Sequence, residues 1–185
     1  MDNSAAPLVA GLDASLVRME VGHVDLVQGH RREAERPIEE VVETLMALKA
    51  KGKERVIGFS GIAPASLRRA AAVHPIDAVQ SASSLQTPSP DLGLVQACAA
   101  LGTTLVAFMP VGRSLLTDDP VASALVAGTR FLATNPRFSV ENHPRNLAIT
   151  EGFCTLARID AELPVGWAHG DRYDAAQRAG PERFC

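Results

Sequence analysis

Four short apolar runs constrain this chain most, because each ends in a polar or aromatic residue and is followed by a helix-like segment. The runs lie near residues 23–28, 55–60, 77–81 and 103–108. Their spacing of roughly 20–30 residues suits β-α-β units, whose right-handed crossovers make the strands parallel. Such units place their chemistry at the carboxyl ends of their strands. The pattern therefore predicts an α/β fold with a site formed by the residues that end the runs.

The residues that end the four runs are His30, Ser60, Gln80 and Phe108. Each has a structural interpretation beside the functional one. The imidazole of His30 could simply bond to a loop, and Ser60 could cap the helix expected at Pro64. Phe108 could belong to the core. Gln80 lies in an apolar run and needs a polar partner, because a buried amide without one is costly, and this favours a ligand.

Helices are expected between the runs from the spacing of apolar residues. Beyond Gly112 the regularity fades, and residues 120–133 suit either a helix or a lid-like loop. A loop with two prolines is expected over Asn135–Asn146, and an irregular tail over 163–185. The expected helices cover residues 5–20, 37–51, 64–73, 92–101 and 147–162.

Composition excludes several classes of protein. The chain has 185 residues, 46% of them hydrophobic, with a net charge of −3, and this suits one domain. Neither a membrane span, a secretory signal nor a basic surface for nucleic acid is visible. The three cysteines lack CxxC spacing, which favours a cytoplasmic setting. His23, His143 and His169 share no ligand-like spacing with Cys, Asp or Glu, so no metal site is expected.

Several motifs occur in an order that resembles one family. His30 follows "SLVRM" and "VDLV", which are similar to the family pattern "SLxRL…DxxDLxxxH". Further matches are "IGFS" at Ile57–Ser60, "HPI…VQ" ending at Gln80, "AFMPVGR" at Ala107–Arg113 and "NPRF…EN" from Asn135. Over residues 8–160 the chain resembles the central part of an aldo-keto reductase, of the bacterial or pyridoxal-reductase-like branch.

The resemblance implies a fold and a set of roles. The family is made of NADPH-dependent (β/α)8 barrels, so this chain would form a partial TIM barrel of about four parallel βα units. His30 would polarise the carbonyl of a small aldehyde or ketone, which an imidazole near neutrality can do by donating a hydrogen bond. The implied cofactor-binding residues are Ser60, Gln80, Phe108, Pro110, Gly112 and Arg113.

Each cofactor-binding residue has an implied task. Ser60 and Gln80 would hold the nicotinamide carboxamide, and Phe108 would stack on the ring where the family usually has Tyr. The turn from Pro110 to Arg113 would run beside the pyrophosphate. The cofactor itself carries the redox chemistry.

The departures from the family predict a weak or inactive enzyme. The family's catalytic Asp, Tyr and Lys lie on early strands without a counterpart here, and Tyr173 is the only tyrosine. We therefore expect a truncated oxidoreductase domain over 1–162, followed by the tail. The alternative is a non-enzymatic remnant, or a half-barrel that self-associates through its open sheet edges.

Overall fold

The computed structural model describes residues 2–31, 33 and 35–162, of which 153–162 are described by their backbone alone. The chain divides into two units, Met1–Arg113 and Ser114–Cys185. Each unit has its own cluster of buried apolar side chains. The predicted tail over 163–185 lies outside the described residues.

The first unit alternates helices and strands as the apolar runs predict. Its strands are β1 (Val24–His30), β2 (Glu54–Ser60), β3 (Ala78–Ala82) and β4 (Thr104–Phe108). Its helices are α1 (Ala5–Met19), α2 (Ile38–Ala50), α3 (Pro64–Val73), the 3₁₀ turn η1 (Ser89–Leu92) and α4 (Leu94–Leu101).

The four strands form one parallel sheet in the order β1-β2-β3-β4. Each crossover between neighbouring strands contains a helix, so the prediction of parallel βα units is confirmed. Within the described residues, β1 and β4 are the edges of the sheet.

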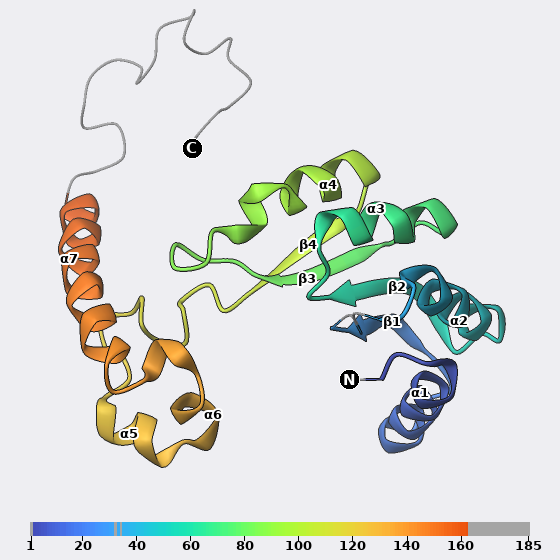
Figure 1. Ribbon diagram of the computed structural model, residues 1–185, viewed down its shortest axis with the longest axis horizontal. Helices are drawn as coiled ribbons and strands as arrows, with labels where there is room; N and C mark the ends of the chain where they lie inside the picture. Colours follow the sequence, from blue (N-terminus) through green and yellow to red (C-terminus); the bar gives the residue numbers. More distant parts are fainter. Residues whose placement is uncertain (1, 32, 34, 163–185) are drawn as a thin grey trace, which may run out of the picture. The chain divides into compact units, whose positions relative to one another are not determined.

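The core of this unit lies between the sheet and its helices (Figure 1). Alternate residues of the strands, such as Ile57, Phe59 and Val79, are at most 4% exposed and belong to this core. The helices meet them with apolar stripes, among them Leu12, Leu16, Val42, Leu45, Leu67 and Ala97. The helices of this unit thus cover one face of the sheet, and we call the opposite side the open face.

Helix α4 begins later than its sequence predicts. A helix over residues 92–101 is expected, but Leu92 ends the short 3₁₀ turn and α4 starts at Leu94. Gly93 separates the two with a φ of 126°, which lies far from helical backbone. The prediction failed because an apolar stripe does not reveal a backbone reversal at one residue.

The second unit is helical where it is described. Residues 120–133, for which a helix and a lid-like loop were both open, contain α5 (Ser123–Gly128) and α6 (Arg130–Ala133). A 3₁₀ turn, η2 (Pro136–Phe138), and helix α7 (Asn142–Glu162) follow. The small core of this unit comprises Leu115, Val126 and Phe138.

The expected loop over Asn135–Asn146 is wrong in part, because α7 already begins at Asn142. The Ser139 hydroxyl accepts a hydrogen bond from the Asn142 N–H at 3.1 Å, and its carbonyl accepts one from the His143 N–H. Pro144 falls in the first turn, where a missing N–H costs nothing. The expectation placed this proline in the loop, before a helix over residues 147–162.

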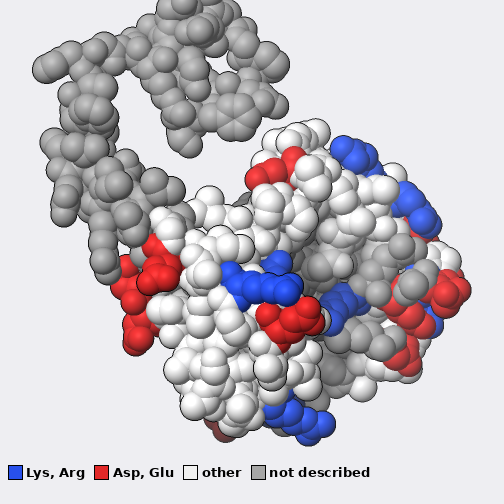
Figure 2. Space-filling view, turned by 60° about the vertical axis from the view of Figure 1, so that its left-hand side comes forward, with Lys and Arg blue, Asp and Glu red and all other residues white. Residues whose placement is uncertain are grey.

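The face seen in Figure 2 carries both acidic and basic side chains on a mostly uncharged surface. Among the described helices, none is both long and apolar enough to cross a membrane.

Candidate functional site

The four strand-ending residues meet at one end of the sheet. The pairing register sets His30 opposite Ser60 and Ser60 opposite Gln80, so these residues form one row across β1, β2 and β3. Phe108 ends β4 opposite Ala82, two positions beyond the partner of Gln80. The carboxyl ends of four parallel strands thus bring together an imidazole, a hydroxyl, an amide and an aromatic ring.

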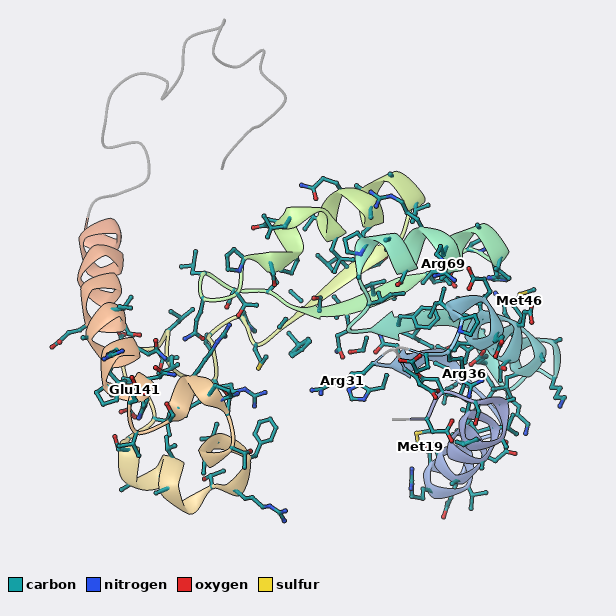
Figure 3. All side chains as sticks on the ribbon, in the orientation of Figure 1. Met19, Arg31, Arg36, Met46, Arg69 and Glu141 are labelled. Atoms are coloured by element: carbon teal, nitrogen blue, oxygen red, sulfur yellow. The ribbon has the colours of Figure 1, made fainter. Side chains whose placement is uncertain are left out.

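Backbone hydrogen bonds fix this row. The N–H of Arg31, directly after His30, donates to the Ser60 carbonyl at 2.8 Å, and Figure 3 shows Arg31 at the end of β1. One strand further, the Gly61 N–H donates to the Gln80 carbonyl at 3.1 Å. The main chain therefore continues its ladder one residue past each strand end and holds the positions that carry the side chains.

The row faces the open side of the sheet. Side chains alternate along a strand, and the neighbours of Ser60 and Gln80, which are Phe59 and Val79, point into the helix-side core. A Cβ added at Gly58 would lie 2.8 Å from the Ala78 carbonyl oxygen and 3.1 Å from the Gln28 side chain. Glycine is therefore required there by the close approach of its neighbours.

The candidate side chains differ in exposure. Ser60 is 6% exposed, Gln80 and Phe108 are half-buried, and His30 is exposed. None of the side chains of His30, Ser60 and Gln80 forms a hydrogen bond with another described residue. The row therefore offers donors and acceptors that the described fold does not use.

Two structural alternatives for these residues are wrong. Ser60 does not cap α3, because that helix begins at Pro64 with Ala63 in the capping position and without a side-chain cap. Phe108 is half-buried and belongs to neither core cluster.

The segment after β4 forms a tight turn. The Gly112 N–H donates to the Met109 carbonyl at 3.0 Å, and Met109, Gly112 and Arg113 have φ values of 57°, 58° and 59°. Pro110 is exposed, Gly112 is buried and Arg113 is half-buried. The predicted cofactor residues Pro110, Gly112 and Arg113 thus lie in the turn that follows Phe108, and two of them, Gly112 and Arg113, have the left-handed backbone that non-glycine residues rarely adopt.

A polar link near His30 was not predicted. The Asn3 N–H donates to the Glu33 carboxylate at 2.9 Å, and the Glu33 N–H donates to the Asn3 side-chain oxygen at 2.7 Å. Glu33 also accepts from Arg36 at 2.9 Å. The bond from Asn3, followed by that from Arg36, lowers the pKa of the Glu33 carboxyl. This link ties the residues before α1 to the loop after His30.

Gln28 is a second residue that the sequence interpretation missed. It lies two positions before His30, so strand alternation alone sets both on the same face. Together with Leu26 and His30 it lines a groove of about 460 Å³ between β1 and α1. No group of three or more His, Cys, Asp or Glu residues suited to a metal occurs in the described part of the chain.

Comparison with known proteins agrees with this geometry. Among solved structures, a glycerol dehydrogenase from Gluconobacter oxydans superposes with a TM-score of 0.69 at 23% identity, covering 85% of this chain and 48% of that one. An aldo-keto reductase from Bacillus halodurans gives 0.60 at 27% identity, covering 65% and 42%. The α/β fold is that of part of a TIM barrel.

The relatives found by sequence share a higher identity with this chain. A probable aldo-keto reductase from Glycine max is 35% identical over 159 residues, which are 84% of this chain and 46% of that protein. Aldo-keto reductase yakc from Schizosaccharomyces pombe is 33% identical over 180 residues, with 92% and 53% covered. The chain thus spans about half the length of the curated relatives it matches. Residues 2–164 match the model of the aldo/keto reductase family, and the chain belongs to that family.

Proposed function

We propose that this chain supplies part of an NADPH-dependent oxidoreductase site for small aldehydes and ketones. The observation that carries the proposal is the row of His30, Ser60 and Gln80 at paired positions on one end of a parallel sheet. Family membership supports the reaction type, and the name of the Schizosaccharomyces pombe relative includes NADP(+).

The residues present fit a nicotinamide. A carboxamide needs both a donor and an acceptor, and the Ser60 hydroxyl and Gln80 amide provide both without competing partners among the described residues. Phe108 would support the ring, and the turn of Pro110, Gly112 and Arg113 would hold the pyrophosphate. When bound, the cofactor would supply the hydride.

His30 acts on the substrate side of this proposal. It is the exposed member of the row, so its imidazole can approach a carbonyl oxygen from the rim. A donated hydrogen bond stabilises the negative charge that develops on that oxygen. His30 would therefore orient and polarise the carbonyl, while Ser60 and Gln80 set the face that the nicotinamide presents.

Turnover by this chain alone is expected to be slow. The row contains no tyrosine, and Tyr173, the only one in the sequence, lies outside the described residues. A missing general acid costs roughly 10²–10⁴-fold in rate. We therefore propose binding of NADPH with little reduction, and a cytoplasmic location in keeping with the free Cys98 thiol.

A pair of glutamine variants tests the proposal. Fluorescence titration with NADPH should show binding by the wild-type chain that Gln80→Ala weakens by about tenfold, the value of one lost hydrogen bond. The control is Gln96→Ala on α4, whose side-chain amide donates to the Asp91 carbonyl at 3.0 Å and is not part of the proposed site. NADPH oxidation with 4-nitrobenzaldehyde should be slow in all three proteins.

Three results would contradict the proposal in different ways. Equal NADPH affinity of both variants would show that Gln80 does not bind the cofactor. Rapid turnover by the wild-type chain would contradict the expected weak activity. No NADPH binding at all would favour the alternative of a non-enzymatic half-barrel. That alternative draws support from the exposed apolar side chains of the open face, such as Leu26 and Val106, each 38% exposed.

A further inference from the structure

The second unit contains a pocket of about 360 Å³. Its walls come from α5, α6, η2 and the first residues of α7, all between positions 123 and 144. The lining residues that the structure describes all belong to this unit, so the pocket is defined without reference to the parallel sheet. Pockets that bind small molecules usually measure roughly 300–1,000 Å³, and this one lies at the lower end of that range.

One wall of the pocket carries a buried imidazole with an unused nitrogen. His143, in the first turn of α7, is 2% exposed. Its Nδ1 lies 3.3 Å from the Ser123 hydroxyl at the start of α5, within hydrogen-bond distance. Its Nε2 is also buried and has no hydrogen-bond partner in the part of the chain that the structure describes. A buried polar atom without a partner costs free energy, so a ligand that bonds to Nε2 would remove this cost.

The imidazole of His143 is held in position before a ligand binds. Its Nδ1 contacts the Ser123 hydroxyl, and its backbone N–H donates to the Ser139 carbonyl at 2.9 Å. The Phe138 ring lies beside the imidazole, with 5.4 Å between the ring centroids and an angle of 45° between the planes. Phe138 itself is 3% exposed and belongs to the small core. A side chain fixed in this way loses little further freedom on binding, which favours affinity.

The lining of the pocket favours a neutral ligand with an apolar body. None of the described lining residues is Asp, Glu, Lys or Arg, so a charged group would lose its hydration without gaining an acidic or basic partner. A metal ion is also unsuited, because the described residues contain no group of three or more His, Cys, Asp or Glu that could hold one. Most of the lining side chains are apolar, namely Val126, Ala127, Ala133, Phe138, Val140 and Pro144.

The polar part of the ligand is best matched by a hydroxyl group. If the Ser123 hydroxyl donates to Nδ1, Nε2 carries the proton of the neutral imidazole and is a donor. If the hydroxyl accepts from Nδ1, Nε2 is an acceptor. A hydroxyl group both donates and accepts, so it fits Nε2 in either tautomer, whereas a carbonyl group fits only one of them.

We propose that this pocket binds a small neutral molecule with an apolar body and one hydroxyl group, an alcohol or a phenol, and that Nε2 of His143 is its polar anchor. The residues of this site belong to the second unit, whereas the row of His30, Ser60 and Gln80 belongs to the first. The inference therefore does not depend on the proposed function.

Titration of the full chain with 4-fluorophenol, followed by fluorine NMR, tests this inference. A ligand of about eight non-hydrogen atoms should bind with a dissociation constant of about 1 mM or lower. His143→Phe keeps an aromatic ring but removes Nε2, so the affinity should fall by about tenfold, the value of one hydrogen bond. Fluorobenzene lacks the hydroxyl group and should bind equally to both proteins. The difference between the two probes separates loss of the hydrogen bond from a change in the shape of the pocket.

Two further variants serve as controls. His23→Phe replaces an exposed imidazole that precedes β1, and it should leave the affinity for 4-fluorophenol unchanged. Ala133→Leu enlarges a side chain that lines the pocket and keeps a good helix former in α6. It should weaken the binding of both probes by about tenfold or more, because the added atoms crowd the ligand. Circular dichroism should stay native in every variant.

Three outcomes would overturn the proposal. They are no binding of 4-fluorophenol by the wild-type chain, an unchanged affinity in His143→Phe, and an equal loss of affinity for both probes in that variant. In the second case, a loss of affinity in His30→Phe would show that the probe binds at the ends of the strands instead. NADPH is absent from these titrations, so failure here is distinct from failure of the proposed function.

Discussion

At the scale of single residues, Glu54 is the least satisfied group of the described fold. It begins β2, is 3% exposed, and neither carboxylate oxygen has a hydrogen-bond partner among the described residues. Burial raises the pKa of this carboxyl to about 7, although the charge of Lys49 acts in the opposite direction. Below about pH 7, the Glu54 carboxyl of the folded chain is therefore mainly protonated.

This raised pKa makes stability depend on pH. The unfolded carboxyl ionises near its ordinary pKa of 4.5 and the folded one near 7, so stability falls as pH rises between these values and then levels off. Each unit of pKa corresponds to about 1.4 kcal/mol, so the loss is about 3 kcal/mol at most. Glu54→Gln cannot ionise and should lose less stability over this range.

Urea unfolding at about pH 5 and about pH 7.5 measures this difference. The matched control is Glu43→Gln on the exposed side of α2, which should keep the pH dependence of the wild-type chain. Equal pH dependence of Glu54→Gln and the wild-type chain would contradict the prediction.

At the scale of elements, one ion pair links two neighbouring helices. Arg69 of α3, labelled in Figure 3, is one partner. It donates to both carboxylate oxygens of Glu39 on α2, at 2.8 and 2.7 Å. Both side chains are partly exposed, at 52% and 34%, so solvent screens much of their attraction. The sequence alone does not predict this pair, because a contact between residues 30 positions apart has no local signal.

A double-mutant cycle should measure this pair. Glu39→Ala and Arg69→Ala should couple by less than about 1 kcal/mol, and less still at about 1 M salt. Arg68→Ala provides the control, because among the described residues Arg68 forms no hydrogen bond or ion pair with Glu39, so its coupling should be near zero. A coupling that does not respond to salt would contradict an electrostatic origin.

The strands were predictable because the sequence signal for each strand lies within a few consecutive residues. Apolar runs of strand length ended close to residues 30, 60, 80 and 108, and polar breaks separated them from the helices. The late start of α4 and the early start of α7 were not predictable in this way. Gly93 sets the start of α4 through its backbone angle, and Ser139 sets the start of α7 through a capping hydrogen bond. Neither feature shows in the spacing of apolar residues.

The candidate site was predictable in its residues but not in its register. Parallel strands imply that His30, Ser60 and Gln80 lie at the same end of the sheet. Their direct pairing, however, depends on hydrogen bonds between distant segments. The link between Asn3 and Glu33 escaped for the same reason, whereas strand alternation could have placed Gln28 on the face of His30. The family motifs identify which residues belong to the site, whereas the contacts between those residues depend on how the chain packs.

At the scale of the whole molecule, the two units have separate cores. The large cluster runs from Leu12 to Cys98, and the small one contains Leu115, Val126 and Phe138. Since stability follows buried apolar area, the first unit carries most of the folding free energy.

A fragment of residues 1–113 should therefore fold alone. Its far-ultraviolet circular dichroism should show both helix and strand, and its thermal transition should be cooperative, with a midpoint within about 5 °C of the main transition of the full chain. Residues 114–185 alone should show no cooperative transition. A fragment 1–113 that melts without cooperativity would indicate that the second unit is needed to complete the first.

The bonds from Arg31 to Ser60 and from Gly61 to Gln80 have a wider consequence. Both use main-chain atoms only, and the side chains that they position take no part in them. The alignment of the strand tips is thus independent of which chemical groups stand there. A library randomised at residues 30, 60 and 80 should consequently yield mostly folded proteins, which makes this framework a starting point for grafting unrelated reactivities.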